Sequence, residues 1–477
     1  MTRRAPVVGV AGLGYMGLAT ALGFAHVGTS VVGYEVRPEV RRALTRGQTT
    51  IHEPGIGPLL TEGVKSGRFR VVDSWKALVD ETEVIFLCLP TPRRNDGHID
   101  LRPMLRGVRE LGAALRTWPE PRLVVVKSTV VPGTTEEVLR PALERHSGHH
   151  PPLLTVASNP EFLAEGSMVQ DVLEPERIVL GVSNTRDGAT LRSIYRGFRV
   201  PILSVTPTGA ELVKYASNAF LALKVTFINE IARIAEAVGT DVDSVARAVG
   251  LDSRIGAKFL QAGPGFGGSC FEKDVKALVA RARDLGVEPR TLSALVPSNE
   301  DQTRHAFDIV ERSVGSLRQK RVAVLGLAFK AGTDDVRDSR ALPIVRYARA
   351  AGATVRVHDP VALDNFERSW QASGGGTRGV RFCRSIGEAI RGADVAVLQT
   401  PWPVYLGFSA RWTASMRRPL VVDLRRALPQ RVRQRPDLEW VGLGTATAGR
   451  GRDRAETQPP KKARATKRRH PIRRRRS

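Results

Sequence analysis

Residues 263–274 read GPGFGGSCFEKD and place one cysteine, Cys270, where a glycine-rich loop enters a predicted helix. The free N–H groups and the dipole at a helix start favour a thiolate, and the glycines let a substrate approach the backbone. Cys270 is therefore a candidate nucleophile. Asp274 lies one turn further on and is expected on the same helical face, where it can orient a water or the neighbouring Lys273.

The other two cysteines lack this setting. Cys88 lies in an apolar run that predicts a strand, so it is expected in the core, and Cys383 has arginines beside it but no glycine loop. Three scattered cysteines without a C-x-x-C or a Cys/His cluster predict neither a disulfide framework nor a metal site. With no signal-peptide pattern and no run of about 18 apolar residues, we expect a cytoplasmic protein without a membrane span.

Gly12, Gly14 and Gly17 form a G-x-G-x-x-G pattern directly after a strand-like run and before an apolar helix. The first glycine permits the tight turn, the second lets backbone N–H groups approach a pyrophosphate, and the third allows close helix–strand packing. Glu35 follows at the end of the next predicted strand, where a carboxylate accepts ribose hydroxyls and repels a 2′-phosphate. The pattern predicts NAD as cofactor, although Arg37 nearby softens the preference over NADP.

The rest of the chain repeats this strand–helix rhythm twice, around a long helix. Strands are predicted at 7–12, 31–34, 69–72, 84–89 and 123–126, and again at 321–325, 354–358, 395–398 and 420–422. Residues 208–238 carry apolar side chains at helical spacing with almost no glycine or proline. The fold class is therefore α/β, with two Rossmann-like, doubly wound domains joined by a long central helix and a helical middle domain.

At 477 residues and 42% hydrophobic composition, the chain can bury more than one core, since single cores rarely exceed roughly 250–300 residues. The expected division is 1–205 for cofactor binding, 206–315 for the helical domain with the cysteine loop, 316–447 for the second sheet, and a basic tail at 448–477. From 450 to 477 there are 13 Lys/Arg and two acids, which is +11 of the total net charge of +25. We expect a disordered tail; contact with nucleic acid or another polyanion is possible there but not favoured.

Seven motifs in order resemble those of the UDP-glucose/GDP-mannose dehydrogenase family, over about residues 7–427. They are the GLGYMG loop at 12–17, LPTP at 89–92, KSTV at 127–130, SNPEFLAEG at 158–166, ELVKYASNAF at 211–220, the cysteine loop, and GLAFKAGTDDVRDS at 326–339.

This resemblance implies roles for particular residues. Lys214 and Asn218 match the residues that bind the developing oxyanion at C6 of the sugar, and their spacing puts both on one helical face. Glu161 and Glu165 match loop acids, Glu161 acting as a base through water and Glu165 contacting substrate. Thr129 matches a residue that helps to hold the catalytic water.

The implied reaction is a four-electron oxidation of UDP-glucose to UDP-glucuronate with two NAD and one water. The first hydride transfer gives an aldehyde, which Cys270 captures as a thiohemiacetal. A second hydride transfer gives a thioester, which a water held near Asp274, Thr129 and Glu161 hydrolyses.

The resemblance also implies two sets of contacts. The cofactor set is Gly12, Gly14, Tyr15, Met16, Gly17, Glu35, Thr91, Pro92, Thr129, Glu165, Lys273 and Arg337. The substrate set is Glu161, Phe162, Leu163, Glu165, Lys214, Asn218, Arg254, Lys258, Phe259, Gly265, Phe266, Gly267, Phe329 and Lys330. Lys330 and Arg337 would supply charge to the pyrophosphate and sugar.

The residues around Cys270 resemble the UDP-glucose and GDP-mannose branches of the family more than the N-acetylhexosamine branch, which usually has His before Cys. Residues 254–260 lean towards UDP-glucose, with GDP-mannose or another nucleotide sugar as the alternative. Gln261, Arg340 and Arg426 depart from residues common in relatives, which puts sugar identity and affinity in doubt rather than the chemistry.

Two other function classes remain open from the sequence. A two-electron dehydrogenase of the 3-hydroxyacid type would share the first domain and the long helix but would not need Cys270. A non-catalytic polyanion-binding protein could use the same fold as a scaffold. Because the long helix is apolar on more than one stripe, we expect it to be buried, and a symmetric homodimer through this helix with an interface of roughly 2,000 Å² or more.

Overall fold

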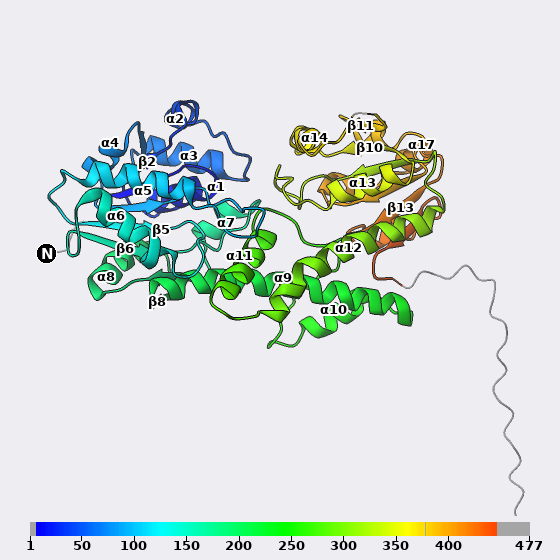
Figure 1. Cartoon of the computed structure of the whole chain (residues 1–477). Coiled ribbons are helices and arrows are strands. Elements are labelled where there is room, and N and C mark those ends of the chain that lie inside the picture. Colours follow the sequence, from blue (N-terminus) through cyan, green and yellow to red (C-terminus); the bar gives the residue numbers. More distant parts are fainter. Residues whose placement is uncertain (1–5, 377, 446–477) are drawn as a thin grey trace, which may run out of the picture.

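The computed structural model describes residues 6–376 and 378–445. The predicted basic tail at 448–477 lies outside these residues. Two sheet domains stand side by side, and a layer of helices runs beneath them and joins them (Figure 1).

The first domain is built on an eight-stranded sheet in the order β3-β2-β1-β4-β5-β6-β7-β8. Its strands are β1 (Val8–Ala11), β2 (Val31–Tyr34), β3 (Phe69–Val72), β4 (Val84–Leu87), β5 (Arg122–Val126), β6 (Leu154–Ser158), β7 (Ile178–Gly181) and β8 (Ile202–Val205). Its helices are α1 (Tyr15–His26), α2 (Pro38–Thr45), α3 (Ile56–Lys65), α4 (Trp75–Glu81), α5 (Arg102–Leu115), η1 (Thr135–Leu139), α6 (Arg140–Ser147), α7 (Met168–Leu173), α8 (Thr185–Ile194) and η2 (Tyr195–Gly197).

The central strands of this sheet are continuous apolar runs because helices cover both faces. Every residue of β1, β2 and β4 is buried, as expected for a parallel sheet between two helical layers. The order 3-2-1-4 places the topological switch point between β1 and β4, where the loops after both strands meet. Pairing is parallel except between β6 and β7, so the strands at that end depart from the all-parallel plan that the rhythm predicts.

The middle of the chain is helical, with α9 (Pro207–Val238), α10 (Val242–Gly250), α11 (Phe271–Asp284) and α12 (Arg290–Val314). Helix α9 begins where the Thr206 side chain accepts a hydrogen bond from the Gly209 N–H, and it ends at Gly239 in the left-handed region. The expectation that α9 is buried all round does not hold within one chain. Phe220 is 60% exposed and Val238 is 70% exposed, because the two sheet domains and α10–α12 cover only part of its circumference.

The second domain has a six-stranded parallel sheet in the order β11-β10-β9-β12-β13-β14. Its strands are β9 (Arg321–Leu325), β10 (Thr354–His358), β11 (Val380–Phe382), β12 (Val395–Leu398), β13 (Leu420–Asp423) and β14 (Glu439–Gly442), and its helices are α13 (Ala341–Ala350), α14 (Leu363–Ala372), α15 (Ile386–Ile390), α16 (Pro403–Leu406), α17 (Ala410–Ser415) and α18 (Gln430–Arg433). Separate apolar clusters lie on the two faces of each sheet, which confirms the predicted α/β architecture with two Rossmann-like domains and a helical middle. None of the helices in the described ranges is long and apolar enough to cross a membrane.

Candidate active site

The three glycines of the loop after β1 have different surroundings. Gly12 has φ +91°, and a Cβ there would lie 2.4 Å from the carbonyl oxygen of Cys88, while a Cβ on Gly17 would lie 1.8 Å from the carbonyl oxygen of Gly12. Around Gly14, in contrast, no heavy atom lies within 4 Å of that position. The first and third glycines are thus required by protein packing, and the second faces open space where a pyrophosphate can approach the backbone.

Glu35 completes the cofactor site at the end of β2. One carboxylate oxygen accepts a hydrogen bond from the Leu13 N–H (3.0 Å), and the other accepts from the backbone N–H (3.2 Å) and Nε (2.9 Å) of Arg37. Burial works to raise the pKa of Glu35, but the Arg37 and Leu13 hydrogen bonds lower it overall. The group is therefore an ionised carboxylate with lone pairs left for ribose hydroxyls, and Arg37 neutralises part of its charge.

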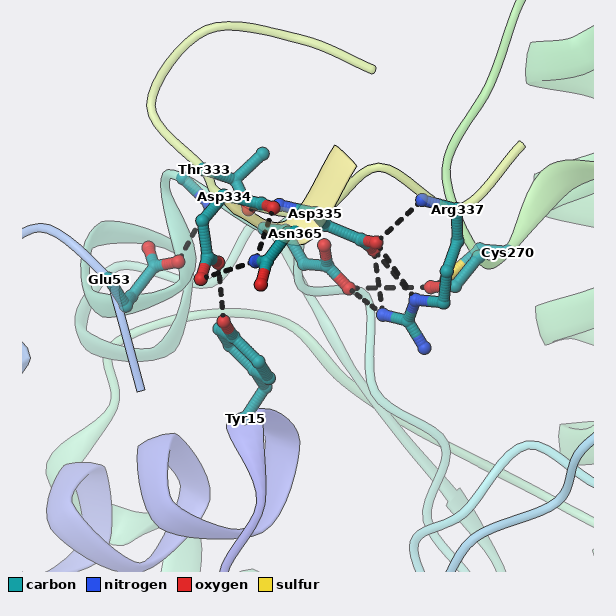
Figure 2. Close-up of polar contacts among 11 residues, drawn as sticks. Tyr15, Glu53, Cys270, Thr333, Asp334, Asp335, Arg337 and Asn365 are labelled. Carbon is teal, nitrogen blue, oxygen red and sulfur yellow. Dashed lines mark hydrogen bonds and ion pairs between the residues drawn. The ribbon is translucent and has the colours of Figure 1, made fainter. Parts of the chain in front are cut away.

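Tyr15 and Met16 are the first two residues of α1, directly after the glycine loop. The Tyr15 hydroxyl donates to Asp334 Oδ1 in the second domain (2.9 Å), and Asn365 Nδ2 donates to the other oxygen of Asp334 (2.9 Å), as Figure 2 shows. Met16 packs against the core of the first domain. Tyr15 therefore connects the cofactor loop to the second domain.

Cys270 lies at the start of α11, directly before its first residue. The thiol is accessible to solvent, whereas Cys88 and Cys383 are buried. Desolvation by the cleft walls and then the negative charge of Asp274 raise the pKa of the Cys270 thiol, and the charge of Lys214 works to lower it. Cys270 is therefore an accessible thiol that is protonated at rest, rather than the ready thiolate that the helix start alone suggests.

Lys214 and Asn218 lie on α9, and both are buried. Lys214 Nζ forms an ion pair with Glu161 Oε1 at 2.9 Å, and Asn218 Nδ2 donates to Asp274 Oδ2 at 2.6 Å. Burial works to lower the pKa of Lys214, but Glu161 and then Cys270 raise it overall. A protonated ammonium and an amide donor thus lie together beside the cysteine, which is the arrangement that stabilises an oxyanion.

Glu161 and Asp274 are the acidic partners of these two donors. Burial works to raise the pKa of Glu161, but the charge of Lys214 lowers it overall. Asp274 is 1% exposed, and its second oxygen accepts from Lys273 Nζ at 2.5 Å. Lys273 therefore positions the Asp274 carboxylate, and its ammonium group contacts this carboxylate in the structure.

The second domain forms the opposite wall of the site. Glu165 from the first domain pairs with Arg337 Nη2 (3.1 Å), and Arg337 also forms an ion pair with Asp335 (2.7 Å), next to Cys270 in Figure 2. Burial lowers the pKa of Lys330, whose Nζ lies 5.6 Å from the Phe329 ring centre. This wall therefore presents two cations, Arg337 and Lys330, to the cysteine loop, and Arg337 is already paired with two carboxyl groups.

Glycines of the cysteine loop allow the loop to pack closely on the second domain and on α12. A Cβ on Gly267 would lie 2.5 Å from the carbonyl oxygen of Asp338, and one on Gly265 would lie 2.7 Å from Asn299 Oδ1. Phe266 is buried, and its ring packs on Phe271 (5.8 Å between ring centres). The side chain of Phe266 is thus part of the core, which leaves only its backbone for substrate.

The remaining predicted residues fall into two groups. Thr129, Thr91 and Pro92 lie on the loops after β5 and β4, Phe162 stacks under Arg177 (4.1 Å), Leu163 packs on the core of the first domain, and Phe259 packs on Phe271 (6.1 Å). Arg254 and Lys258 are not brought to the cysteine within one chain. Their side chains are 88% and 83% exposed and pair with Asp252 and Glu176.

Three residues that the sequence reasoning missed also belong to the site. The Ser269 hydroxyl contacts both the Cys270 thiol (3.6 Å) and Glu165 (3.3 Å), and Asp335 lies beside Glu165. Burial lowers the pKa of Arg425 to about 10, and no carboxylate of residues 6–376 or 378–445 forms an ion pair with it. Its Nη1 lies 3.1 Å from the Cβ position of Gly263, so this cation at the cysteine loop can receive an anion.

Two of the departures noted in the sequence form ion pairs with the helical layer. Arg426 has φ +55°, and its buried side chain forms ion pairs with Asp241 and Asp243 at the start of α10. Arg340 contacts Glu272 at 3.4 Å on α11, and Gln261 is exposed. Arg426 and Arg340 therefore hold the second domain on the helical layer.

Models of the UDP-glucose/GDP-mannose dehydrogenase family match the chain in three parts: the NAD binding domain at 7–199, the central domain at 208–301 and the UDP binding domain at 323–430. The chain belongs to the UDP-glucose/GDP-mannose dehydrogenase family. It is an NAD-dependent oxidoreductase, and the open backbone at Gly14 and the ionised Glu35 fit that cofactor.

Individual relatives of this dehydrogenase family are similar along nearly the whole chain. The UDP-glucose 6-dehydrogenase AglM of Haloferax volcanii is 40% identical over 88% of this chain and 97% of its own length. A UDP-glucose 6-dehydrogenase of Rhizobium meliloti is 41% identical over 87% of this chain and 94% of its own. The solved structure of a UDP-glucose dehydrogenase from Pyrobaculum islandicum superimposes with a TM-score of 0.86, at 38% identity, over 93% of this chain and 99% of that one.

Proposed function

We propose that this family member oxidises the C6 alcohol of UDP-glucose to the carboxylate of UDP-glucuronate, using two NAD and one water per sugar. The observation that carries the proposal is the position of an accessible thiol, Cys270, at the start of α11 beside the buried donors Lys214 and Asn218. A two-electron alcohol dehydrogenase needs a base and a donor but has no use for a nucleophile there.

Each half of the reaction uses the same donors. When bound, NAD accepts a hydride from C6 in both oxidations. Glu161, which its lowered pKa keeps ionised, takes the C6 hydroxyl proton through water. Lys214 and Asn218 donate hydrogen bonds to the C6 oxygen as negative charge develops on it, and they do so again when the thiol adds to the aldehyde.

Hydrolysis of the thioester needs a positioned water. We expect Asp274, Thr129 and Glu161 to hold this water, and Asn218 and Lys273 fix the Asp274 carboxylate on both oxygens. Water attacks the thioester carbon, the C–S bond breaks, and the thiol is regenerated. Formation of a free carboxylate makes the overall reaction irreversible.

Cations on the second-domain wall support a nucleotide diphosphate as the handle of the substrate. Arg425, Lys330 and Arg337 face the cysteine loop. Arg425 is half-buried, its Nε donates to the Gln399 carbonyl oxygen (2.9 Å), and it has no carboxylate partner in the described ranges. Diphosphate oxygens would satisfy this positive charge. The names of the relatives favour UDP-glucose, with GDP-mannose as the second candidate because the family includes both.

A panel of UDP-glucose, GDP-mannose and UDP-N-acetylhexosamines, each with NAD and with NADP, tests the proposal. We expect NADH formation with UDP-glucose at the highest kcat/KM and weak or no use of NADP. A higher kcat/KM with GDP-mannose would identify GDP-mannose, rather than UDP-glucose, as the substrate. No activity with any nucleotide sugar would refute the proposed function.

We also propose that two copies pair through α9. The side chains exposed on this helix include Leu212, Phe220, Phe227, Ile234 and Val238. Phe220, Phe227 and Ile234 are spaced by seven and therefore share one face. A partner copy would bury this apolar stripe, and Lys214 and Asn218 on the same helix would be held more rigidly.

Two further expectations belong with this proposal. Residues 1–205 bind the cofactor, residues 206–315 carry the cysteine loop and the dimer contact, and residues 316–447 bind the nucleotide sugar. A cytoplasmic location suits an enzyme whose nucleophile is a free thiol.

A further inference from the structure

The Cys270 thiol has a side-chain hydrogen-bond partner that the mechanism above does not use. The Ser269 hydroxyl oxygen lies 3.6 Å from Cys270 Sγ and 3.3 Å from Glu165 Oε1. A thiol can donate to a hydroxyl oxygen while that hydroxyl donates to a carboxylate. Thiol, hydroxyl and carboxyl group therefore form a continuous path for one proton.

The other acid near the thiol is not free to act as its base. Asp274 is 1% exposed, and its two oxygens accept from Lys273 Nζ (2.5 Å) and Asn218 Nδ2 (2.6 Å). Its negative charge raises the pKa of Cys270, after the larger effect of desolvation. The thiol must lose its proton before it can attack an aldehyde, so an acceptor other than Asp274 is required.

Glu165 has the surroundings of a proton acceptor. Its side chain is 11% exposed, and that of the adjacent Asp335 is 6% exposed. Oxygen Oε2 of Glu165 is buried, and no donor in the described part of the chain reaches it. A hydrogen bond between the Asp335 and Glu165 carboxyl groups needs a proton on one of them, whereas Arg337 Nη2 contacts Glu165 Oε1 at 3.1 Å and stabilises the ionised form. Both protonation states of Glu165 thus have a partner.

Burial, and then the hydrogen bond and charge of Asp335, raise the pKa of Glu165 to about 8. Proton transfer is more efficient when donor and acceptor have similar pKa values, and the raised pKa brings Glu165 closer to a thiol than an ordinary carboxyl group. The charged and titratable groups that act on Cys270 are Asp274, Lys214, Glu161, Lys273, Lys330 and Arg337, and those that act on Glu165 are Asp335, Arg337, Lys330 and Tyr15.

We propose that Ser269 relays the proton of the Cys270 thiol to Glu165 when the thiol attacks the aldehyde, and returns it when the thioester is hydrolysed. This inference rests on the proposed function. As the C–S bond forms, the thiol proton moves to the Ser269 oxygen, the hydroxyl proton moves to Glu165 Oε1, and the carbonyl electron pair moves to the oxygen held by Lys214 and Asn218. No electrons are exchanged with an external oxidant in this step, and hydrolysis reverses each proton transfer as sulfur takes back the C–S electron pair.

The relay joins all three parts of the chain. Glu165 comes from the first domain and Ser269 from the helical layer, while Asp335, which raises the pKa of Glu165, comes from the second domain. Figure 2 shows this junction, with Arg337 and Asp335 next to Cys270.

Ser269→Ala removes the hydroxyl without changing any charge, and Ser269→Thr keeps it. Ser167→Ala is the matched control. This hydroxyl lies two residues after Glu165 but bonds to the Ala164 carbonyl oxygen (3.2 Å) and to Asp171 (3.1 Å). The readouts are NADH formed per UDP-glucose and aldehyde trapped with hydroxylamine. With the relay broken, we expect turnover to fall about tenfold or more, and aldehyde to escape, so that NADH per sugar drops below two.

The threonine variant and the control should keep a ratio of two. A Ser269→Ala enzyme with wild-type turnover and ratio would overturn the relay alone, whereas a wild-type chain that makes no NADH from UDP-glucose would overturn the proposed function instead. As a second measurement, Asp335→Asn should lower the pH at which oxidation of the aldehyde reaches half its maximal rate, because the charge that raises the pKa of Glu165 is removed. A pH profile that Asp335→Asn leaves unmoved would also refute the relay.

Discussion

Replacing Lys214 with methionine removes the cation of a buried ion pair while nearly keeping the length of the side chain. Lys214 Nζ lies 2.9 Å from Glu161 Oε1, and the two side chains are 3% and 11% exposed. Removing one partner of such a pair leaves an uncompensated buried charge, which costs about 3–5 kcal/mol. We expect Lys214→Met to lose about this much unfolding free energy at neutral pH, and its turnover to fall by about 10²–10³ because an oxyanion donor is lost.

The stability loss should depend on pH with a definite sign. In the wild type the folded-state pKa of Glu161 is lowered, so its contribution is present above the unfolded value of about 4.3 and is lost as pH falls through the lower folded value. In the variant, burial without Lys214 raises the pKa of Glu161. The folded variant therefore binds a proton as pH falls from neutral, and its deficit relative to wild type shrinks.

Urea unfolding followed by circular dichroism, at neutral and mildly acidic pH, measures both effects. Lys76→Met is the matched control, since its partner Asp80 lies at 2.6 Å four residues further along the exposed side of α4, where such pairs are worth about 0.3–0.5 kcal/mol. The double variant Lys214→Met with Glu161→Gln should recover much of the stability but not the activity. A Lys214→Met deficit no larger than that of the control, or one that grows on acidification, would refute the reasoning.

Three other variants test separate parts of the site. Cys270→Ser should fold normally but stall turnover, because an oxygen ester is hydrolysed less readily than a thioester; full activity would contradict covalent catalysis. Glu35→Ala should weaken NAD binding by about 1.5–3 kcal/mol. It should also reduce the preference for NAD over NADP, because Arg37 loses its carboxylate partner. The KM values for the two cofactors measure both effects. Phe227→Arg should shift the assembly to monomer in light scattering, while Leu203→Arg, equally exposed on β8, should not.

Features specified by local sequence could be predicted. The loop after β1 needs glycine at positions that meet the Cys88 and Gly12 carbonyls, so its pattern is visible in the chain itself. The central strands could also be predicted, because helices cover both faces of the sheet and the strands are therefore uninterrupted apolar runs. Strands β6, β7, β8, β11 and β14 were not predicted. β8, β11 and β14 are partly exposed strands at sheet edges, and β6 and β7 lie where the first sheet departs from parallel pairing.

Features that depend on distant contacts could not be predicted. Asp335 acts on Glu165 across 170 positions of chain, and Ser269 matters because folding brings it against Glu165. The second domain lacks the G-x-G-x-x-G pattern, although the loop after its first strand, β9, makes the same kind of hydrogen bond as the loop after β1. Leu327 N–H donates to Asp359 at 2.7 Å just as Leu13 N–H donates to Glu35 at 3.0 Å, but four further N–H groups also use the Asp359 carboxylate.

The central claim is that one site oxidises the sugar twice through a covalent cysteine intermediate. The most direct measurement is the amount of NADH formed per UDP-glucose when the sugar is limiting and NAD is in excess, with the nucleotide-sugar product identified by mass spectrometry. Two NADH per sugar with UDP-glucuronate as product is the predicted result. One NADH per sugar, with an aldehyde or ketone as product, would contradict it.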